Sequence, residues 1–315
     1  MHPAFSVIFF TTASGAGFGL LALLGVLAPA GMLPADRVFG LVALALAFVA
    51  AAIGLVASTF HLGRPERAWR AFSQWRSSWL SREGLASVAT FIPAGLFAIG
   101  WVFAGSPGGI WGVFGVLGAV GAVASIYCTA MIYRSLKTIQ RWCNVWVAPN
   151  YFALALMTGA LWLDFLLAVF GALGPGMVWL AVLLILLAAA LKLAYWRYID
   201  RTHSLSTAES ATGLGAFGRV RLFEAPHTEE NYLLKEMGYR IARKHAAKLR
   251  LIALALAFVV PLALTLALLA LPGPAAVAAA LLAAASASAG VLVERWLFFA
   301  EAKHTVTLYY GAATA

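Results

Sequence analysis

The sequence predicts an all-α integral membrane protein, a bundle of eight transmembrane helices with both termini in the cytoplasm. Composition is the first reason, because 63% of the 315 residues are apolar and 11% are charged, whereas soluble chains average roughly 45–50% and about 25%. Long apolar stretches also recur along the chain, and the charges gather between alternate pairs of them. Eight spans of about 20 residues use about half of the chain, which leaves no room for a large soluble catalytic domain.

The apolar stretches that are long enough to cross a membrane lie at about 5–29, 38–60, 84–105, 110–133, 149–171, 177–197, 251–271 and 275–299. The first has no charged segment before it and no small-residue cleavage site after it, so we expect it to stay in the membrane and not to be removed as a signal peptide. Within it, Gly15 and Gly19 have the spacing of small residues that lets two helices approach closely. We expect residues 1–315 to form a single membrane-anchor domain.

The basic residues predict the orientation. Of the 22 Lys and Arg, only Arg37 lies in the short turns after the first, third, fifth and seventh spans. The others lie on the opposite side, if Lys192, one turn inside the sixth span, extends its amine to that surface. The positive-inside rule then places both termini and all long connections in the cytoplasm. The net charge of +10 is mainly a consequence of this topology, although a basic face also suits an acidic partner or anionic lipid.

The connection at 198–250 is the longest, and it is too short and too polar to hold a core of its own. Thr228 and the two glutamates after it form a typical capped helix start, and basic residues gather near the end, so the pattern predicts a cytoplasmic helix over 228–250. The glycines from Gly213 to Gly218 match a dinucleotide-binding spacing, but no strand is predicted before them. A flexible loop is the better interpretation.

The histidines and cysteines limit the cofactors that this chain can hold. The six histidines are His2, His61, His203, His227, His245 and His304. None lies inside a predicted span, whereas a membrane b-type haem needs two at matched depth, so we expect no haem. Cys128 and Cys143 are too few to hold an iron–sulfur cluster. Any iron–sulfur chemistry must come from a partner.

The segment FHLGRPERAWRAFSQWRSSWLSRE, residues 60–83, interleaves aromatic residues with five arginines, one histidine and two glutamates. Aromatic belts and cytoplasmic arginines occur at the interface of many membrane proteins. Here, however, Gly63 and Pro65 predict a sharp turn directly after His61, which would hold the imidazole near the membrane surface. A solvated helix end explains His61 equally well.

Three further residues of this segment complete a possible redox site. Glu83 begins the third predicted span, and Trp75 and Trp79 supply broad apolar faces. A titratable imidazole and a carboxylate beside aromatic faces suit a quinone, whose two carbonyl oxygens gain or lose protons as electrons move. The pattern therefore indicates a quinone-binding site.

Polar residues elsewhere in the spans are weaker signals. Asp164 in the fifth span is either a proton-path residue, a polar packing contact or part of a water-filled cleft. It lies at a different depth from Lys192, so we expect no direct pair between them. Glu294 and Arg295 are sequence neighbours that point in different directions, so each is expected to need its own partner.

The eight spans, the FHLGRPERA turn, the SWLSRE sequence and the ERWLFFAEAKH stretch at 294–304 resemble the membrane anchors of DMSO reductase-type complexes, the DmsC family. The resemblance implies a bacterial cytoplasmic (inner) membrane protein that holds a molybdopterin catalytic subunit and a four-cluster ferredoxin-like iron–sulfur subunit. It also implies electron exchange with ubiquinone or menaquinone, without haem. His61 and Glu83 match the histidine and glutamate of that family implicated in quinol binding. Arg64, Arg295 and His304 are added because of their chemistry and shared face.

DMSO reductase anchors usually have their termini outside, whereas this chain carries its long basic connection on the terminal side. It is more similar to the branch associated with cytoplasm-facing sulfite dehydrogenase. The preferred hypothesis is therefore an anchor that passes electrons from sulfite oxidation to quinone, with the molybdenum chemistry in another chain. The alternative within the family is the anchor of a quinol-oxidising DMSO or related terminal reductase.

Two alternatives come from other classes of protein. A purely structural anchor would bind no quinone near 60–83. A small-solute or proton transporter would use Asp164 and Lys192 as its pathway, but few spans carry polar groups and the sequence shows no inverted repeat. We expect no nucleic-acid partner.

Overall fold

A computed structural model describes residues 5–202, 206–224 and 243–310 of the chain. Within these residues it is all-helical, and eight helices are long and apolar enough to cross a membrane. Seven are α1 (Phe5–Leu27), α2 (Arg37–Ala57), α3 (Trp79–Val102), α4 (Gly109–Arg134), α5 (Val147–Val169), α6 (Pro175–Arg201) and α12 (Gly273–Ala300). The other is made of α10 (Ala246–Leu254), η4 (Ala255–Val259) and α11 (Val260–Ala267). The predicted number of spans is confirmed.

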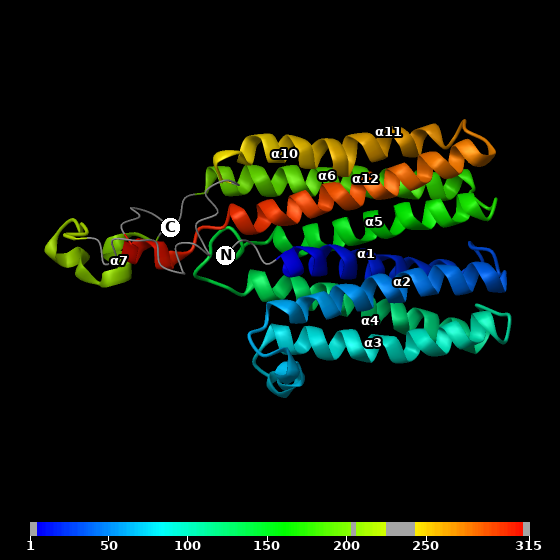
Figure 1. The fold of residues 1–315 in the computed structure, drawn as a ribbon, viewed down its shortest axis with the longest axis horizontal. Coiled ribbons are helices and arrows are strands. Elements are labelled where there is room, and N and C mark those ends of the chain that lie inside the picture. Colours follow the sequence, from blue (N-terminus) through cyan, green and yellow to red (C-terminus); the bar gives the residue numbers. More distant parts are fainter. Residues whose placement is uncertain (1–4, 203–205, 225–242, 311–315) are drawn as a thin grey trace.

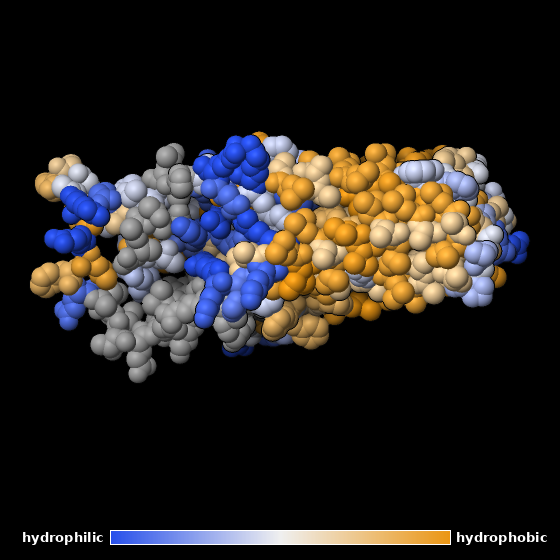
Figure 2. Space-filling view, turned by 90° about the horizontal axis from the view of Figure 1, so that it is seen from above, coloured by the Kyte–Doolittle hydropathy of each residue, from blue (hydrophilic) through white to orange (hydrophobic). Residues whose placement is uncertain are grey.

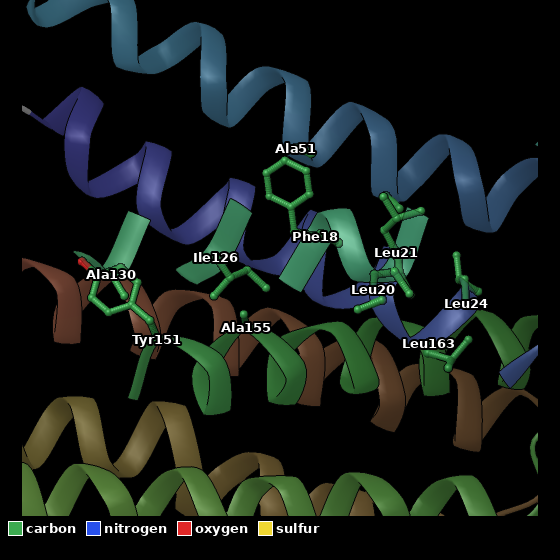
Figure 3. Packing of buried hydrophobic residues seen from close by; sticks show 14 of the residues in the cluster. Phe18, Leu20, Leu21, Leu24, Ala51, Ile126, Ala130, Tyr151, Ala155 and Leu163 are labelled. Atoms are coloured by element: carbon green, nitrogen blue, oxygen red, sulfur yellow. The ribbon is translucent and has the colours of Figure 1, made fainter. Parts of the chain in front are cut away.

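The bundle has α1 and α5 at its centre (Figure 1). These two spans are the most enclosed, with 67% of each apolar window buried. Helices α2, α3 and α4 pack together on the α1 side, and α6, α12 and the α10–α11 span pack on the α5 side. Phe18, Leu20 and Leu24 of α1 fill the space between the neighbouring helices (Figure 3).

The connections that follow α2, α4 and α6 lie at one end of the bundle, together with the start of α1 and the residues after α12 (Figure 1). Hydrophilic side chains gather at this end, and apolar side chains cover most of the remaining length (Figure 2). We call this end the charged face, defined by residues 58–78, 135–146, 206–224, 243–250 and 301–310. It includes five short helices, η1 (Ser58–His61), η2 (Pro65–Gln74), α7 (Ala208–Thr212), η3 (Leu214–Phe217) and η5 (Thr305–Tyr310).

Glycines bring α1 and α5 into backbone contact. A Cβ atom added to Gly19 would lie 1.9 Å from the carbonyl oxygen of Ala155, and one added to Gly159 would lie 2.4 Å from the Leu20 nitrogen. Without glycine the two central helices must separate, since protein interiors leave no such space. The packing role expected of the glycines in the first span is thus confirmed for Gly19, whereas the nearest atom to Gly15 is the Ala155 Cβ at 3.9 Å.

We expect Gly19→Ala to lower the free energy of unfolding by about 1–3 kcal/mol, because the added methyl group overpacks the α1–α5 contact. Gly95→Ala in α3 is the matched control, since a Cβ there has nothing within 4 Å and alanine favours the helix. Unfolding by sodium dodecyl sulfate in mixed micelles measures both variants. Equal stability of the two variants would contradict the close approach.

The α10–α11 span contains one turn of π-helix, in which the Val260 N–H donates to the Ala255 carbonyl five residues earlier. The cause is Pro261, which has no N–H and whose ring crowds the preceding turn. Ser286 of α12 donates to the Leu256 carbonyl at 2.8 Å, so the irregular turn keeps its polar groups satisfied against α12.

The structure revises the predicted connection at 198–250. Of the helix expected over 228–250, residues 228–242 lie outside the described part of the chain, and α10 begins at Ala246. Residues Ala208–Phe217 form two short helices, α7 and η3 (Leu214–Phe217), where a flexible loop was expected. Gly213 ends α7 with a φ of +71°, a left-handed conformation that favours glycine.

Candidate functional site

Glu83 lies in the second turn of α3, because that helix begins at Trp79, five residues before the predicted span. Two contacts hold the preceding segment against this first turn. The Ser81 hydroxyl donates to the carbonyl of Ala71 in η2, and Gly84 leaves room for the Phe72 ring. Glu83 is only 4% exposed, and its carboxylate accepts a hydrogen bond of 2.7 Å from the Thr129 hydroxyl of α4. The carboxylate therefore faces the interior of the bundle.

Arg82 turns away from Glu83. Its guanidinium lies 4.3 Å from the centre of the Trp79 ring and donates to the carbonyls of Trp75 at 2.9 Å and Arg76 at 2.6 Å. Arg82 thus links Trp75 and Arg76 to the start of α3. The Glu83 carboxylate accepts its hydrogen bond from a neutral group, the Thr129 hydroxyl.

Two other predicted residues of 60–83, Arg64 and Trp75, lie exposed on the charged face. His61 is the last residue of η1, directly before the turn to η2. The side chain of Arg64 is 71% exposed and forms an ion pair of 4.0 Å with Glu66. Trp75 is half exposed, with the Arg76 guanidinium 5.4 Å from its ring centre. Arg82 links the Trp75 backbone to the Trp79 ring, and Arg64 is left in solvent.

A second group of charges lies on the other side of the bundle axis. The Lys192 amine of α6 forms an ion pair with the Glu294 carboxylate of α12, and both side chains are 1% exposed. The prediction that Lys192 extends to the surface is wrong, because a buried carboxylate satisfies its amine inside the bundle. Arg295 is also paired with Glu294, at 3.4 Å between Nε and Oε2. The expectation that these two neighbours need separate partners is therefore wrong as well.

Tyr151 of α5 lies between the two groups. The Arg295 guanidinium lies 3.7 Å from the centre of the Tyr151 ring, which is an attractive cation–π contact between two buried side chains. The Tyr151 hydroxyl is buried and makes no hydrogen bond of good geometry to any described residue. It lies in electrostatic range of both Glu83 and Glu294.

A cavity of about 20 Å³ lies between α1, α4, α5 and α12, and Tyr151 is one of its lining residues. Phe18, Ile126 and Ala155 form part of its apolar wall (Figure 3). Its polar lining includes Thr11, Thr129, Tyr151, Thr158 and Arg295. A space of this size holds about one water molecule and no organic ring.

Two predicted residues lie apart from this group. Asp164 is buried in α5, about 20 Å along that helix from Tyr151, and its Oδ2 has no hydrogen-bond partner among the described residues. His304 follows α12 and packs edge-on against Trp142, with 5.5 Å between ring centres. Burial, with a smaller contribution from Arg243, lowers the pKa of His304 below its ordinary value, so the neutral imidazole is favoured there.

A network of charges holds the charged face near the end of α12. Arg250 forms two hydrogen bonds with Asp200, at 2.6 Å and 2.9 Å, and one with Glu301 at 2.8 Å. Burial raises the pKa of Glu301, while Arg250 partly opposes that shift. An open hollow of about 620 Å³ beside them is lined by Arg141, Asp200, Arg243, Ala246, Ala247, Arg250, Leu251, Glu301 and Lys303.

The residues that sequence reasoning missed are Thr129, Tyr151 and the pairing of Lys192 with Glu294. A hydroxyl in a span is too common to single out Thr129 or Tyr151. Lys192 and Glu294 did carry a signal, since each is a costly charge inside a predicted span and one cation and one anion at similar depth balance each other.

A family model described as the DMSO reductase anchor subunit (DmsC) matches residues 1–311. The chain belongs to this family. A relative from Allochromatium vinosum, a sulfite dehydrogenase subunit, is 37% identical over 98% of this chain and 99% of its own length. The resemblance seen in the motifs is confirmed. Membership of the DmsC family, with the eight spans, makes the chain a multi-pass membrane anchor of an oxidoreductase complex.

Proposed function

We propose that this single-domain anchor is also the quinone-reactive subunit of its complex, and that quinone binds beside His61 and Glu83. The observation that carries the proposal is the Glu83 carboxyl, which is buried at the inner edge of the aromatic 60–83 segment and bonded to the Thr129 hydroxyl. A carboxyl in this place delivers or accepts a proton where an apolar ring reaches it from the membrane. His61 supplies a second titratable group.

The quinone ring has its place at the edge of the bundle. The central cavity of about 20 Å³ is too small for it, since ligand pockets measure roughly 300–1,000 Å³. Trp75 and Trp79 present aromatic faces beside η2 and the start of α3. We assign them the apolar walls of the site, and Arg64 the surface edge. We place Arg295 on the interior side of the site and His304 at the surface, near Trp142.

The partners dock on the charged face in this proposal. A four-cluster ferredoxin-like iron–sulfur protein passes electrons to the quinone, and a molybdopterin protein performs the substrate chemistry. The hollow beside Arg141, Arg250 and Lys303 offers cations to an acidic partner surface. By the positive-inside rule this face lies in the cytoplasm of a bacterium, with the chain in its cytoplasmic membrane.

Sulfite oxidation is the direction that we favour, because the relative from Allochromatium vinosum belongs to a sulfite dehydrogenase. The balanced reaction of the complex is sulfite plus water plus quinone giving sulfate plus quinol. Two electrons leave sulfur, and the quinone takes up these electrons and two protons. A reductase running from quinol to DMSO or a related acceptor would use the same anchor in reverse.

The test is electron transfer in the purified complex with His61→Ala and Glu83→Gln. Each variant should lose quinone reduction by about 10²-fold or more, which is the range for a lost acid–base group, and keep sulfite oxidation with an artificial dye. His245→Ala and Glu224→Gln are the controls, since both residues are exposed and lie outside the proposed quinone contacts. Unchanged quinone turnover in both test variants would refute the site.

A further inference from the structure

Four buried charged side chains lie at similar depth in the bundle. Glu83 and Arg295 lie four and five residues from the charged-face end of their helices, and Lys192 lies nine residues from it. At 1.5 Å per residue they are about 6–14 Å below that face. Glu294 lies next to Arg295, and all four are at most 4% exposed. They form a layer across the bundle and not a column along it.

The charges of this layer balance in two ways. With Glu83 and Lys192 both ionised, two anions face two cations. With a proton moved from the Lys192 ammonium to the Glu83 carboxylate, both become neutral, and the Glu294–Arg295 pair remains. A buried net charge is costly, and neither arrangement creates one. A proton exchanged between Lys192 and Glu83 therefore avoids the main electrostatic barrier to moving charge through the interior.

The polar groups between the two ends line two neighbouring spaces. Thr129 binds Glu83 at 2.7 Å and also lies 3.0 Å from the Ser125 carbonyl, so its single hydroxyl proton has two alternative acceptors. Thr129 lines the cavity, as do Tyr151 and Arg295. Tyr151 and Arg295 also line the space at Lys192 and Glu294, which has no room for a water molecule, so Tyr151 meets the ion pairs there through direct contact with Arg295.

The cavity suits one water molecule as the link. Its volume exceeds the roughly 10–15 Å³ that a water needs. The hydroxyls of Thr11 and Thr158 donate to carbonyls of their own helices, so their oxygens can still accept a hydrogen bond from a water in the cavity. The Tyr151 hydroxyl, without a hydrogen bond of good geometry, is available to donate or accept.

We propose that this layer is a proton path, which runs from Lys192 and Glu294 through Tyr151, a water in the cavity and Thr129 to Glu83. It rests on the proposed function, because Glu83 is the group that hands the proton to the quinone. In quinone reduction the ring takes two electrons from the iron–sulfur partner, one proton from Glu83 and one from the His61 side. Glu83 is then reprotonated through the path.

Protons enter the path from the charged face. Glu301 lines the hollow on that face and lies in electrostatic range of Lys192. Tyr195, whose ring centre is 4.2 Å from the Lys192 amine, donates its hydroxyl to the Arg141 carbonyl at 3.0 Å. Glu301 and Tyr195 thus lie on the charged-face side of the buried amine, and we assign them the entrance of the path.

The test uses Tyr151→Phe in the purified complex. This change removes one hydroxyl that makes no good hydrogen bond and keeps the ring under Arg295, so the variant is expected to fold. We expect kcat for quinone reduction to fall by about 10-fold or more, with an unchanged KM for quinone and a larger solvent deuterium isotope effect. Thr129→Val is expected to behave alike, with Thr129→Ser restoring turnover. Thr265→Val, a buried threonine of α11 away from the cavity, is the control.

The outcomes separate this proposal from the one on which it rests. If Tyr151→Phe and Thr129→Val both keep kcat within twofold and the same isotope effect, while Glu83→Gln abolishes quinone reduction, the path is wrong and the quinone site stands. If Glu83→Gln itself leaves quinone reduction unchanged, both are overturned. An equal loss in Thr265→Val would mean that general packing, and not proton transfer, explains the effect.

Discussion

Glu294→Leu is expected to lower the free energy of unfolding by about 3–5 kcal/mol, the range measured when one partner of a buried ion pair is removed. Glu294 is the anion that contacts both Lys192 and Arg295. Its loss leaves two cations, 1% and 2% exposed, without that countercharge. Unfolding by sodium dodecyl sulfate in mixed micelles, with the full chain, gives the free energy.

A second variant tests the cause. Glu294→Leu leaves two cations without their countercharge, and adding Lys192→Met removes one of them. The double variant should therefore recover part of the lost stability. This expected coupling is the signature of a direct pair in a double-mutant cycle. If the two effects simply add, Lys192 and Glu294 do not interact as described.

The number of spans and their alternation were predictable from sequence, because the thickness of the bilayer imposes a minimum apolar length on every helix. The start of α3 was less predictable. The sequence pattern placed it at residue 84, whereas Ser81 and Gly84 dock α3 against η2 and extend the helix back to Trp79. That extension turns Glu83 from an end residue into a buried one.

The candidate site was predictable only where its residues share one segment. Glu83 and the two tryptophans stand within 60–83, so an interfacial pattern revealed them. Thr129 reaches Glu83 from 46 residues away in sequence, and Glu294 reaches Lys192 from 102 residues away. No local pattern carries such pairings, because helix packing decides them. The snorkelling rule failed at Lys192 because it describes a helix facing lipid, whereas this amine faces α12.

Arg250→Ala is expected to lower the free energy of unfolding by about 3 kcal/mol near pH 8. Arg250 binds Asp200 and Glu301 at once, and its loss leaves Glu301, 6% exposed, without that guanidinium. Burial already raises the pKa of Glu301, and removal of the opposing cation raises it further. An acid whose pKa is higher in the folded than in the unfolded state contributes fully to stability at a pH below its unfolded-state pKa. That contribution is lost as the pH rises through its folded-state pKa.

The deficit of Arg250→Ala should therefore depend on pH. As the pH falls from about 8 to about 5, Glu301 becomes protonated in the variant first, and the stability gap to the parent protein narrows. Unfolding measured in detergent across this range gives the gap at each pH. Arg64→Ala is the control, because its exposed ion pair of 4.0 Å is worth at most about 1 kcal/mol. A gap for Arg250→Ala that stays constant or widens toward acid would contradict the role of Glu301, since its carboxylate is the group whose charge Arg250 compensates.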